Sequence, residues 1–437
     1  MNRPAPVRVA LDATAVLGTP TGVGRVVAGI LAALAIRQDI DLVGYGLTWN
    51  GRRQLGPALP PGVAVARRAM VARPLIEAWA HLDHPRIERW AGSLDVVHGT
   101  NFVVPPARAA RVVTVYDLTA VRFPELCTPA ARRYPALVRR ALGAGAVVHT
   151  LSAWVAGEVV ELLGADPGQV RVIPPGIGRS PGDVAPSPPA SFGRIQPFGR
   201  ILSSYGRKRP NGQIRPNVAG AGSAGSAGRG ESDGRGGSGG RAGSEVGPTG
   251  RLARPGAPPG PPYILALGTA EPRKDLPGLV RAFDSLAGEV PEVELQIAGP
   301  PGWGQAELDQ AIAGAAHRRR IVRLGWVPDP AALVAGAALL AYPSLYEGFG
   351  FPPLEAMAAG VPVVATSAGA VPEVAGGAAR LVPPGDPDAL AEAMGQVLSD
   401  QAERRRLVEA GRRRVAVFSW DAAGDALARL YQELAGR

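Results

Sequence analysis

The sequence predicts an α/β protein with two doubly wound, Rossmann-like domains that face each other across a cleft. Three observations lead to this fold class. Short β-branched runs alternate with helical segments along residues 1–178, the alternation restarts after residue 260, and the strand-like runs are apolar throughout rather than at every second position. Uninterrupted apolar runs are typical of parallel strands that are covered on both faces. Alternating strands and helices indicate βαβ units in an open sheet.

The first predicted domain, residues 1–178, contains seven strand-like runs. They cover residues 7–13, 42–49, 63–68, 95–100, 111–118, 146–152 and 170–176. The segments between them, such as AARRYPALVRRALGAG, carry apolar residues at helical spacing. Such a series of βαβ units predicts one parallel sheet with helices on both faces.

The second predicted domain, residues 261–419, repeats this organisation. Its strand-like runs cover residues 263–269, 293–299, 321–327, 337–344, 361–369 and 378–385. The helical pattern breaks near Phe418 and Ser419, and a final helix over 420–437 is expected to pack back on the first domain. Ligands of open α/β sheets bind beyond the carboxyl ends of the strands, so site residues are expected in the strand-to-helix turns.

The net charge of +10 comes mainly from the segment that separates the two domains. Residues 179–260 contain 12 Lys and Arg but only 4 Asp and Glu, whereas the other 355 residues together carry +2. The same segment holds 20 of the 58 glycines and 11 of the 44 prolines. Such a composition buries too little apolar surface to offset the entropy of ordering, so we expect a disordered insertion.

The sequence favours a cytoplasmic location. Cys127 is the single cysteine and cannot form an internal disulfide, which favours a reducing compartment. The first residues lack the apolar run of a signal peptide, and no stretch reaches about 18 apolar residues. The arginines of RRYPALVRRAL, residues 132–142, would suit contact with the inner face of an anionic membrane, although a solvated helix face is the simpler interpretation.

A basic pair follows the first strand of the second domain, in GTAEPRKDLPGLVRAF. Arg273 and Lys274 lie just before a helix expected to start near Asp275 and Leu276. Two cations beside a helix N-terminus form an anion site, because free N–H groups and the helix dipole add to the side-chain charges. Two solvated surface cations are the alternative interpretation.

The most informative motif is YEGFGFPPLEAMAAG, with two acids eight residues apart. Gly348 and Gly350 would let the backbone approach a ligand closely. Glu355, expected in the first turn of a helix, is suited to hold the hydroxyls of a ribose, as acids do in dinucleotide sites. Glu347 lies on the loop before it. A first-turn helix charge and a solvent-exposed loop acid are the alternatives for Glu355 and Glu347.

These two motifs, together with the residues that follow as far as DPDALAEAM, resemble the family 4 retaining glycosyltransferases of GT-B fold. The resemblance is almost continuous over residues 261–420 and looser over 7–178. It implies that Arg273 and Lys274 bind the donor diphosphate, that Glu347 binds donor sugar hydroxyls, and that Glu355 holds the ribose. The amides of Phe349 and Gly350, with Gly348 beside them, would lie near the phosphate or sugar.

The implied reaction moves a hexose, preferably mannose, from a nucleotide-diphosphate sugar to a glycan or lipid-linked acceptor. The donor would be GDP-mannose or a UDP-sugar, and the family is thought to retain anomeric configuration without a divalent metal or other cofactor. Prepositioned cations stabilise the charge that develops on the leaving diphosphate. The D-x-D of Asp386 and Asp388 lies at a predicted helix start, so capping is expected there rather than a metal.

In the first domain, a glycine loop and two polar residues follow strand ends. Gly22 and Gly24 precede a helix expected to begin near Arg25 and Val26, and the resemblance places this loop beside the donor phosphates. A tight turn is the alternative. His98 and Asn101, in HGTNFVVPP, are candidates for contact with the acceptor sugar, or for capping the turn.

Tyr116 and Asp117 mark a departure from the family pattern. Many relatives have His-Asp here, and that histidine lies near the transferred sugar. Tyr116 cannot shuttle a proton at neutral pH as imidazole can, so it is assigned to the acceptor side and no histidine base is predicted. Asp117 is the candidate catalytic carboxylate, beside Arg273, Lys274 and Glu347.

Two alternative functions remain at this stage. A nucleotide-sugar epimerase would share the architecture, although the spacing of the acidic pair argues against it. A Gly/Arg-rich RNA-binding protein would use residues 207–254, but this segment lacks the interleaved aromatic residues that stack on bases, so no nucleic-acid partner is expected. His81 and His84 lie three residues apart without a third ligand, which favours surface histidines over zinc.

Overall fold

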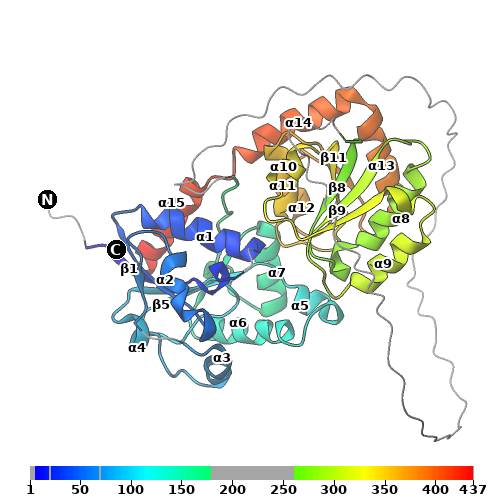
Figure 1. The fold of residues 1–437 in the computed structure, drawn as a ribbon. Coiled ribbons are helices and arrows are strands. Elements are labelled where there is room, and N and C mark those ends of the chain that lie inside the picture. The colour runs from blue at the N-terminus through cyan, green and yellow to red at the C-terminus, as the bar shows by residue number, and fades with distance from the viewer. Residues whose placement is uncertain (1–4, 19–20, 68–69, 179–259, 437) are drawn as a thin grey trace, which may run out of the picture. The chain divides into compact units, whose positions relative to one another are not determined.

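The computed structural model describes residues 5–18, 21–67, 70–178 and 260–436, all within one compact unit that contains two parallel sheets (Figure 1). Two Rossmann-like sheets confirm the predicted fold class. The predicted insertion, 179–260, lies outside the described residues except for Gly260, so its disorder stays a prediction. Below, the part of the chain that carries the first sheet is called the N-terminal lobe, and residues 260–419 the C-terminal lobe.

The sheet of the N-terminal lobe has seven strands, all paired in parallel, in the order β3-β2-β1-β4-β5-β6-β7. The order reverses between β1 and β4, which are neighbours although two strands separate them in sequence. Val, Ile and Leu fill these strands because helices cover both faces. The strands are β1 (Val7–Asp12), β2 (Ile40–Tyr45), β3 (Ala64–Val65), β4 (Val96–Gly99), β5 (Ala110–Val115), β6 (Val147–Thr150) and β7 (Val170–Val172).

The first helix of this lobe, α1 (Gly22–Ala35), begins three residues earlier than predicted. The hydroxyl of Thr21 accepts a hydrogen bond from Gly24 N at 3.0 Å and so caps the helix at Gly22. The expected start at Arg25 and Val26 is therefore wrong. The other helices are α2 (Leu55–Ala58), α3 (Ala72–His81), α4 (Glu88–Ala91), α5 (Thr119–Arg122), α6 (Tyr134–Gly143) and α7 (Ala153–Leu163).

The sheet of the C-terminal lobe has six parallel strands in the order β10-β9-β8-β11-β12-β13. Here the order reverses between β8 and β11. The two sheets thus share one topology, as the repeated sequence pattern predicts. The strands are β8 (Tyr263–Leu267), β9 (Glu294–Ala298), β10 (Ile321–Gly325), β11 (Leu339–Tyr342), β12 (Val363–Thr366) and β13 (Arg380–Val382).

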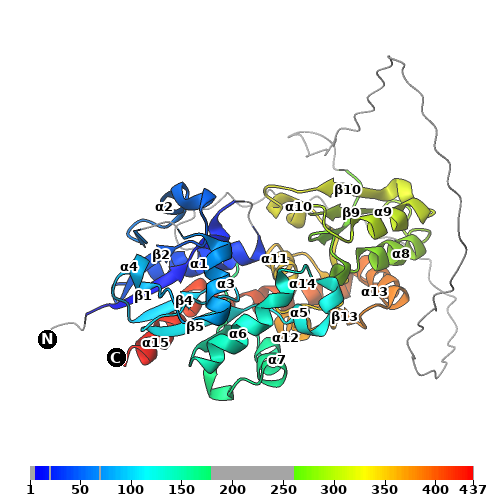
Figure 2. The ribbon, with the colours of Figure 1, turned by 90° about the horizontal axis from the view of Figure 1, so that it is seen from below.

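Helices cover both faces of this second sheet (Figures 1 and 2). On one face lie α8 (Leu276–Leu286), α9 (Gln305–Gly314) and α13 (Pro387–Ser399), and on the other α10 (Ala331–Ala335), α11 (Phe351–Ala358), α12 (Val371–Ala375) and α14 (Gln401–Val415). Phe283 of α8 and Met394 of α13 are fully buried on the first face. Leu354 and Met357 of α11 are buried on the second.

The last helix, α15 (Trp420–Leu434), lies beside α1 of the N-terminal lobe (Figure 1). Trp420 occupies the space above two glycines: a Cβ atom at Gly29 would lie 2.2 Å from its ring, and one at Gly176 would lie 2.4 Å from it. Tyr431 is fully buried and reaches His98 of β4. The hydrophobic core of the N-terminal lobe therefore includes a helix from the far end of the sequence.

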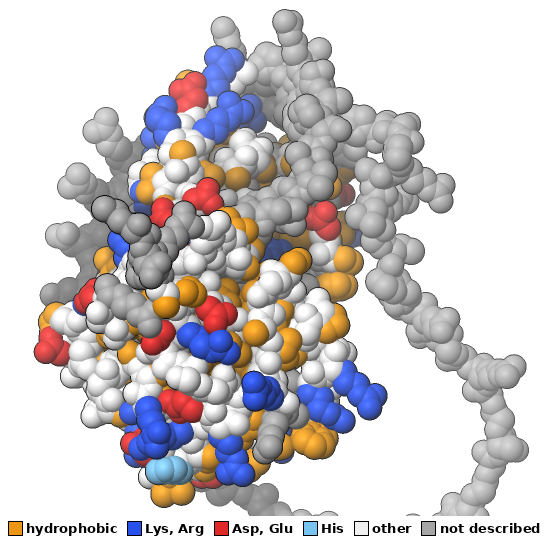
Figure 3. All heavy atoms as spheres, turned by 90° about the vertical axis from the view of Figure 1, so that its left-hand side faces the viewer, with side chains coloured by type: hydrophobic (Ala, Val, Ile, Leu, Met, Phe, Trp, Pro, Cys, Tyr) orange, Lys and Arg blue, Asp and Glu red, His pale blue; other side chains and the backbone are white. Residues whose placement is uncertain are grey.

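Every helix in the described part of the chain is too short or too polar to span a lipid bilayer. On the face shown in Figure 3, basic, acidic and apolar side chains are interspersed. Two arginines of the predicted basic segment have acidic neighbours, since Arg133 pairs with Glu77 at 2.5 Å and Arg140 lies 3.8 Å from Asp83. Contact with a membrane surface stays a prediction.

Candidate active site

The topology of the second sheet brings the two predicted donor motifs together. β8 and β11 are neighbours at the point where the strand order reverses. The turn after β8 carries Arg273 and Lys274, and the loop after β11 carries Glu347. Ligands of doubly wound sheets bind at this switch point, outside the carboxyl ends of the strands. Residues 73 positions apart in sequence thus form one cluster for a topological reason.

Glu347 bridges the two cations. Its Oε2 lies 3.0 Å from Arg273 Nη1, and its Oε1 is paired with Lys274 Nζ. Lys274 Nζ also lies 3.2 Å from the hydroxyl of Tyr342, at the end of β11. Glu347 is 6% exposed. Because both carboxylate oxygens are bonded, the acid fixes the positions of the two basic groups and is not a solvated loop residue.

The pKa shifts of Glu347 and Arg273 favour the charged forms of these two groups, whereas that of Lys274 runs the other way. Burial raises the pKa of Glu347, but the charges of Lys274 and Arg273 outweigh this effect and lower it to about 2. Burial lowers the pKa of Lys274, opposed by Glu347. The pKa of Arg273 is raised, because Glu347 and Glu271 more than offset its burial. Glu347 therefore stays a carboxylate at neutral pH and cannot act as a general acid.

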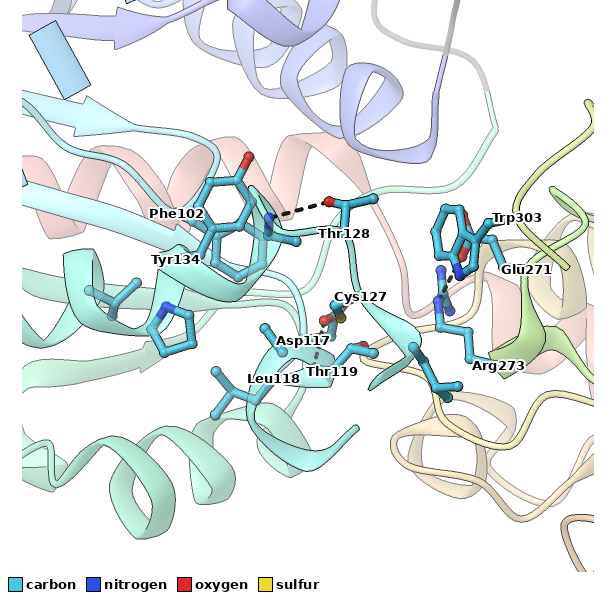
Figure 4. A pocket seen from close by; sticks show the side chains of 15 residues that line it. Phe102, Asp117, Leu118, Thr119, Cys127, Thr128, Tyr134, Glu271, Arg273 and Trp303 are labelled. Carbon is cyan, nitrogen blue, oxygen red and sulfur yellow. Dashed lines mark hydrogen bonds and ion pairs between the residues drawn. The ribbon is translucent and has the colours of Figure 1, made fainter. Parts of the chain in front are cut away.

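Glu271 is a member of this cluster that the sequence analysis missed. Its Oε2 lies 2.9 Å from Arg273 Nε (Figure 4), whereas Glu347 is paired with Nη1 of the same guanidinium group. The cluster thus holds two cations and two carboxylates. An incoming diphosphate would compete with these acids for the same N–H groups. The signal was present in the sequence, because Glu271 stands two residues before Arg273 in the same turn.

The loop after Glu347 needs glycine for reasons internal to the protein. A Cβ atom at Gly348 would lie 1.8 Å from the carbonyl oxygen of Tyr116, and the carbonyl of Gly348 accepts a hydrogen bond from Ser152 Oγ at 2.7 Å. Gly350 has φ +99° and caps α11. The close approach predicted for Gly348 is therefore one to the N-terminal lobe, and ligand contact through these glycines stays a prediction.

Glu355 and Phe349 occupy different environments. Glu355 is the fifth residue of α11, so the expected position in the first turn is wrong, because Gly350 starts the helix earlier. Its carboxylate pairs with Arg25 of α1, and burial raises its pKa against the opposing charge of Arg25. Phe349 is buried, with its ring edge-on to Phe418 at 5.6 Å. A ribose at Glu355 would compete with Arg25.

On the N-terminal side, the two predicted glycines, Gly22 and Gly24, lie inside α1 rather than in a loop before it. A Cβ atom at Gly24 would lie 2.5 Å from the carbonyl oxygen of Ala15, so the fold itself requires glycine there, whereas Gly22 has open space around it. Both glycines lie in the first turn of α1, whose amides are the predicted phosphate contact. That contact stays a prediction.

The structure corrects the prediction that His98 meets an acceptor sugar. His98 lies within β4 and is 0% exposed, with Nδ1 2.6 Å from Tyr431 Oη and Nε2 2.8 Å from Thr114 Oγ1. Burial holds its pKa well below the usual value, and the nearby His149 lowers it further. A strand residue bonded on both ring nitrogens is a core group. Asn101 follows the same strand and is half-buried, and its predicted acceptor contact remains untested.

Tyr116 and Asp117 follow β5 at the same edge of the sheet. The hydroxyl of Tyr116 is buried and has no hydrogen-bond partner among the described residues, and burial raises its pKa. Asp117 Oδ1 accepts a hydrogen bond from Thr119 N at 3.0 Å. Asp117 and Arg273 line one cavity (Figure 4). The structure therefore brings the candidate carboxylate of the N-terminal lobe to the basic cluster.

Tyr346 connects the two halves of this site and was not predicted. Its hydroxyl accepts a hydrogen bond from Leu118 N at 3.0 Å and donates one to Glu158 of α7. Glu158 is buried and also accepts a hydrogen bond from Arg122 Nε at 2.9 Å. Tyr346 immediately precedes Glu347, and Leu118 immediately follows Asp117. The hydroxyl of Tyr346 therefore links the loop that carries Glu347 to the turn that carries Asp117. No sequence motif indicates this link, because it depends on the contact between the lobes.

A second missed carboxylate, Asp12, ends β1 at the switch point of the first sheet. Burial raises its pKa to about 6, against hydrogen bonds from the amide and hydroxyl of Thr14. It pairs in register with Tyr45, whose hydroxyl is buried without a partner among the described residues. An isolated aspartate in an apolar strand run gave no motif by which to find it.

The alternative metal sites receive no support. Asp386 caps α13 by accepting a hydrogen bond from Ala389 N at 2.9 Å, which confirms the predicted capping role. His81 is exposed and lies 3.5 Å from Glu77 one turn away. Within residues 5–18, 21–67, 70–178 and 260–436, no three His, Cys, Asp or Glu side chains are grouped so that they could hold a metal ion.

Comparison with known proteins gives curated relatives that match part of the chain. The chain is 39% identical over 162 residues to the O-antigen chain mannosyltransferase B of Escherichia coli, covering 36% of this chain and 42% of that protein. It is 48% identical over 185 residues to the MMP α-(1→4)-mannosyltransferase of Mycolicibacterium hassiacum, covering 40% and 44%. The matches thus span about two fifths of the length of these curated relatives.

Solved structures share the fold over nearly the whole chain. Anabaena Alr3699/HepE, crystallised with UDP and glucose, aligns with a TM-score of 0.63 at 17% identity and covers 98% of this chain and 100% of that one. WaaG, a glycosyltransferase involved in lipopolysaccharide biosynthesis, aligns with a TM-score of 0.62 at 17% identity over 97% and 99%.

Family models match each lobe separately. The model of the glycosyl transferase 4-like domain matches residues 21–176, and that of the glycosyl transferases group 1 matches residues 252–414. The first match contains Asp117, and the second contains the cluster of Arg273, Lys274 and Glu347. Because the two models together cover more than half of the sequence and each falls on its own lobe, the chain belongs to the family 4 glycosyltransferases of GT-B fold.

Proposed function

We propose that the protein transfers a hexosyl group from a nucleotide-diphosphate sugar to a hydroxyl group of a glycan or lipid-linked acceptor. The observation that supports this most is the buried bridge of Glu347 between Arg273 and Lys274 at the switch point of the second sheet. This cluster shares a cavity, through Arg273, with Asp117 of the other lobe. A donor site on one lobe and a polar acceptor-side group on the other suit a reaction between two substrates.

In the proposed reaction, the bond between the anomeric carbon and the diphosphate oxygen breaks, and the electron pair leaves with the diphosphate. The acceptor oxygen bonds to the same carbon on the same face, and its proton passes to a diphosphate oxygen. Arg273 and Lys274 stabilise the charge that develops on the leaving group. Glu347, held as a carboxylate, accepts hydrogen bonds from the sugar hydroxyls. Attack on the same face retains the anomeric configuration. Because the cations supply the positive charge, we write the reaction without a divalent metal.

We propose mannose as the transferred sugar, with GDP-mannose as the preferred donor over UDP-sugars. The support is the sequence similarity to two mannosyltransferases, which lies at 39% and 48% identity. The nucleotide base has no recognisable partner in the residues described above. Donor assays therefore include both nucleotides.

A donor panel tests the proposal. Purified protein is incubated with GDP-mannose, UDP-glucose and other nucleotide sugars, with and without EDTA, and nucleotide release, melting temperature and product anomer are measured. We expect one donor to be used in the presence of EDTA with retention, and Lys274→Ala and Glu347→Ala to abolish its use. Arg319→Ala and Glu292→Ala, which alter exposed residues of the same lobe, serve as matched controls and keep wild-type turnover.

The alternatives give different results in the same assays. An epimerase would convert the sugar without releasing nucleotide. An RNA-binding protein would respond to no donor but bind RNA tightly with strong dependence on salt. Either result would overturn the proposed transfer.

A further inference from the structure

A cavity of about 170 Å³ adjoins the basic cluster on the side of Asp117 (Figure 4). Among the described residues, the charged lining consists of Asp117, Glu271 and Arg273. Most of the remaining lining is apolar and includes Phe102, Leu126, Ala131 and Trp303, together with Thr119 and Thr128. The cavity is therefore polar where it meets the site and apolar away from it.

The apolar end is formed by the loop after β4, the short turn after α5 and the start of α6. The rings of Phe102 and Tyr134 are stacked with their centres 5.0 Å apart and their planes 2° apart. Leu126 is half-buried on the short turn that follows α5, and Ala131 is half-buried just before α6. Figure 4 shows Phe102 and Tyr134 at one end of the cavity and Trp303 at the other, beside Arg273. Trp303 is 51% exposed, so its indole is available to a ligand.

This lining does not suit a second sugar unit. A pyranose carries a hydroxyl on almost every carbon, and each hydroxyl taken from water into an apolar wall without a partner costs free energy. An apolar group meets no such cost and gains from leaving water. Thr119, which lines the cavity two positions from Asp117, has a buried hydroxyl without a partner among the described residues. Polar recognition is thus concentrated at the Asp117 end.

The size of the cavity limits the apolar group. An apolar protein cavity of about 150 Å³ holds one benzene molecule. A cavity of about 170 Å³ therefore accommodates a six-membered ring or an alkyl segment of about six carbons. The part of the same ligand that bears its hydroxyl groups is not included in this volume and would lie beside Asp117.

We propose that this cavity is the acceptor subsite, and that the acceptor is amphiphilic. Its reacting hydroxyl lies at Asp117, and an apolar ring or short alkyl segment lies between Phe102, Leu126 and Ala131. The inference rests on the proposed glycosyl transfer and adds the chemical class of the acceptor. It assigns Phe102, Leu126 and Ala131 to acceptor specificity.

The experiment compares how tightly the full-length protein binds ligands that share a sugar but differ in their alkyl group. Binding is measured in the presence of the nucleoside diphosphate, GDP or UDP, that the preferred donor releases. The pairs are methyl and n-hexyl α-mannoside, and methyl and n-hexyl β-glucoside, with dissociation constants measured by calorimetry and tryptophan fluorescence. Each buried methylene tightens binding about fourfold. Two buried methylenes therefore predict that the hexyl compound of at least one pair binds more than about tenfold tighter than its methyl partner.

Two variants connect this preference to the cavity. Ala131→Phe fills the apolar end and is expected to reduce the hexyl advantage to less than about twofold. Leu126→Asn makes the wall polar with the same number of side-chain heavy atoms and is expected to reduce the hexyl advantage as well. Ala136→Phe, the same substitution at an exposed residue of α6, is the matched control and keeps the wild-type ratio.

The outcomes separate the two proposals. Equal binding of hexyl and methyl compounds, or a hexyl advantage that Ala131→Phe and Leu126→Asn both leave intact, overturns the acceptor subsite while donor turnover still stands. Absence of any donor turnover overturns the proposed function itself.

Discussion

Replacing Tyr346 by Phe is expected to loosen the active site by removing one oxygen atom. The hydroxyl takes part in two hydrogen bonds, one to the carboxylate of Glu158 and one from Leu118 N at 3.0 Å. A hydrogen bond to a charged group contributes about 1.5–3 kcal/mol and a neutral one about 1 kcal/mol. Since both partners are buried, the free energy of unfolding should fall by about 2–4 kcal/mol.

The same substitution should affect catalysis, because Tyr346 precedes Glu347 and Leu118 follows Asp117. A misplacement of about 1 Å in such a site costs up to about 100-fold in rate. We expect kcat/KM to fall about 10- to 100-fold, mainly through kcat, in a nucleotide-release assay. Tyr263→Phe, which removes a phenol bonded to the carbonyl of Leu333 at 2.7 Å, is the matched control and should lower stability alone.

The reasoning fails if Tyr346→Phe loses no more stability and no more activity than Tyr263→Phe. Urea unfolding and turnover of both variants decide this. An equal loss of stability in the two variants with activity lost only in Tyr346→Phe would keep the positioning role and reject the calculated stability.

Four further predictions concern the carboxylates Glu347 and Asp12 and the residue Gly348. Glu347→Ala leaves two cations without their shared partner and should lower the free energy of unfolding by about 3–5 kcal/mol in urea; an unchanged urea midpoint would contradict this. Because the pKa of Glu347 is lowered to about 2, its stabilisation is complete above its ordinary value of 4.5 and is lost as pH falls toward 2, a loss that Glu347→Gln should remove. The pKa of Asp12 is instead raised from 3.8 to about 6, so stability should decrease as pH rises between these values, by roughly 3 kcal/mol, and urea midpoints of Asp12→Asn should not show this decrease. Gly348→Ala places a Cβ atom 1.8 Å from the carbonyl oxygen of Tyr116 and should reduce kcat/KM at least about tenfold, whereas Gly288→Ala, with open space around it, should not.

The fold and the basic cluster of Arg273, Lys274 and Glu347 were predictable because each depends on a local pattern. Apolar runs separated by helical segments specify parallel strands, and the doubly wound order then follows from short crossovers. That order makes β8 and β11 neighbours, so residues after each strand must lie close together. The family resemblance assigned Arg273 and Glu347 to one site, and this strand order is the physical reason that they meet.

The remaining features depend on packing between distant segments. His98 follows a strand pattern that predicts a residue near the sheet edge, but the hydroxyl of Tyr431 makes it a core group. In the sequence, Glu158 is indistinguishable from an ordinary acidic residue of a helix. Its role becomes visible only in the structure, where the hydroxyl of Tyr346 from the other lobe donates a hydrogen bond to it. The raised pKa of Asp12 follows from its burial, which a single acid in an apolar run does not reveal.

The position of Trp420 has a consequence for the order of folding. This residue lies against Gly29 and Gly176, yet it is translated after the entire second sheet. β1–β7 therefore leave the ribosome before α15 is made, and the surface on which α15 packs, including the region of His98 that Tyr431 later covers, is still exposed. The N-terminal lobe completes its core only after α15 has been synthesised. A fragment ending near residue 178 should therefore expose this apolar surface and aggregate. The boundary between folding units thus does not coincide with the boundary between sheets.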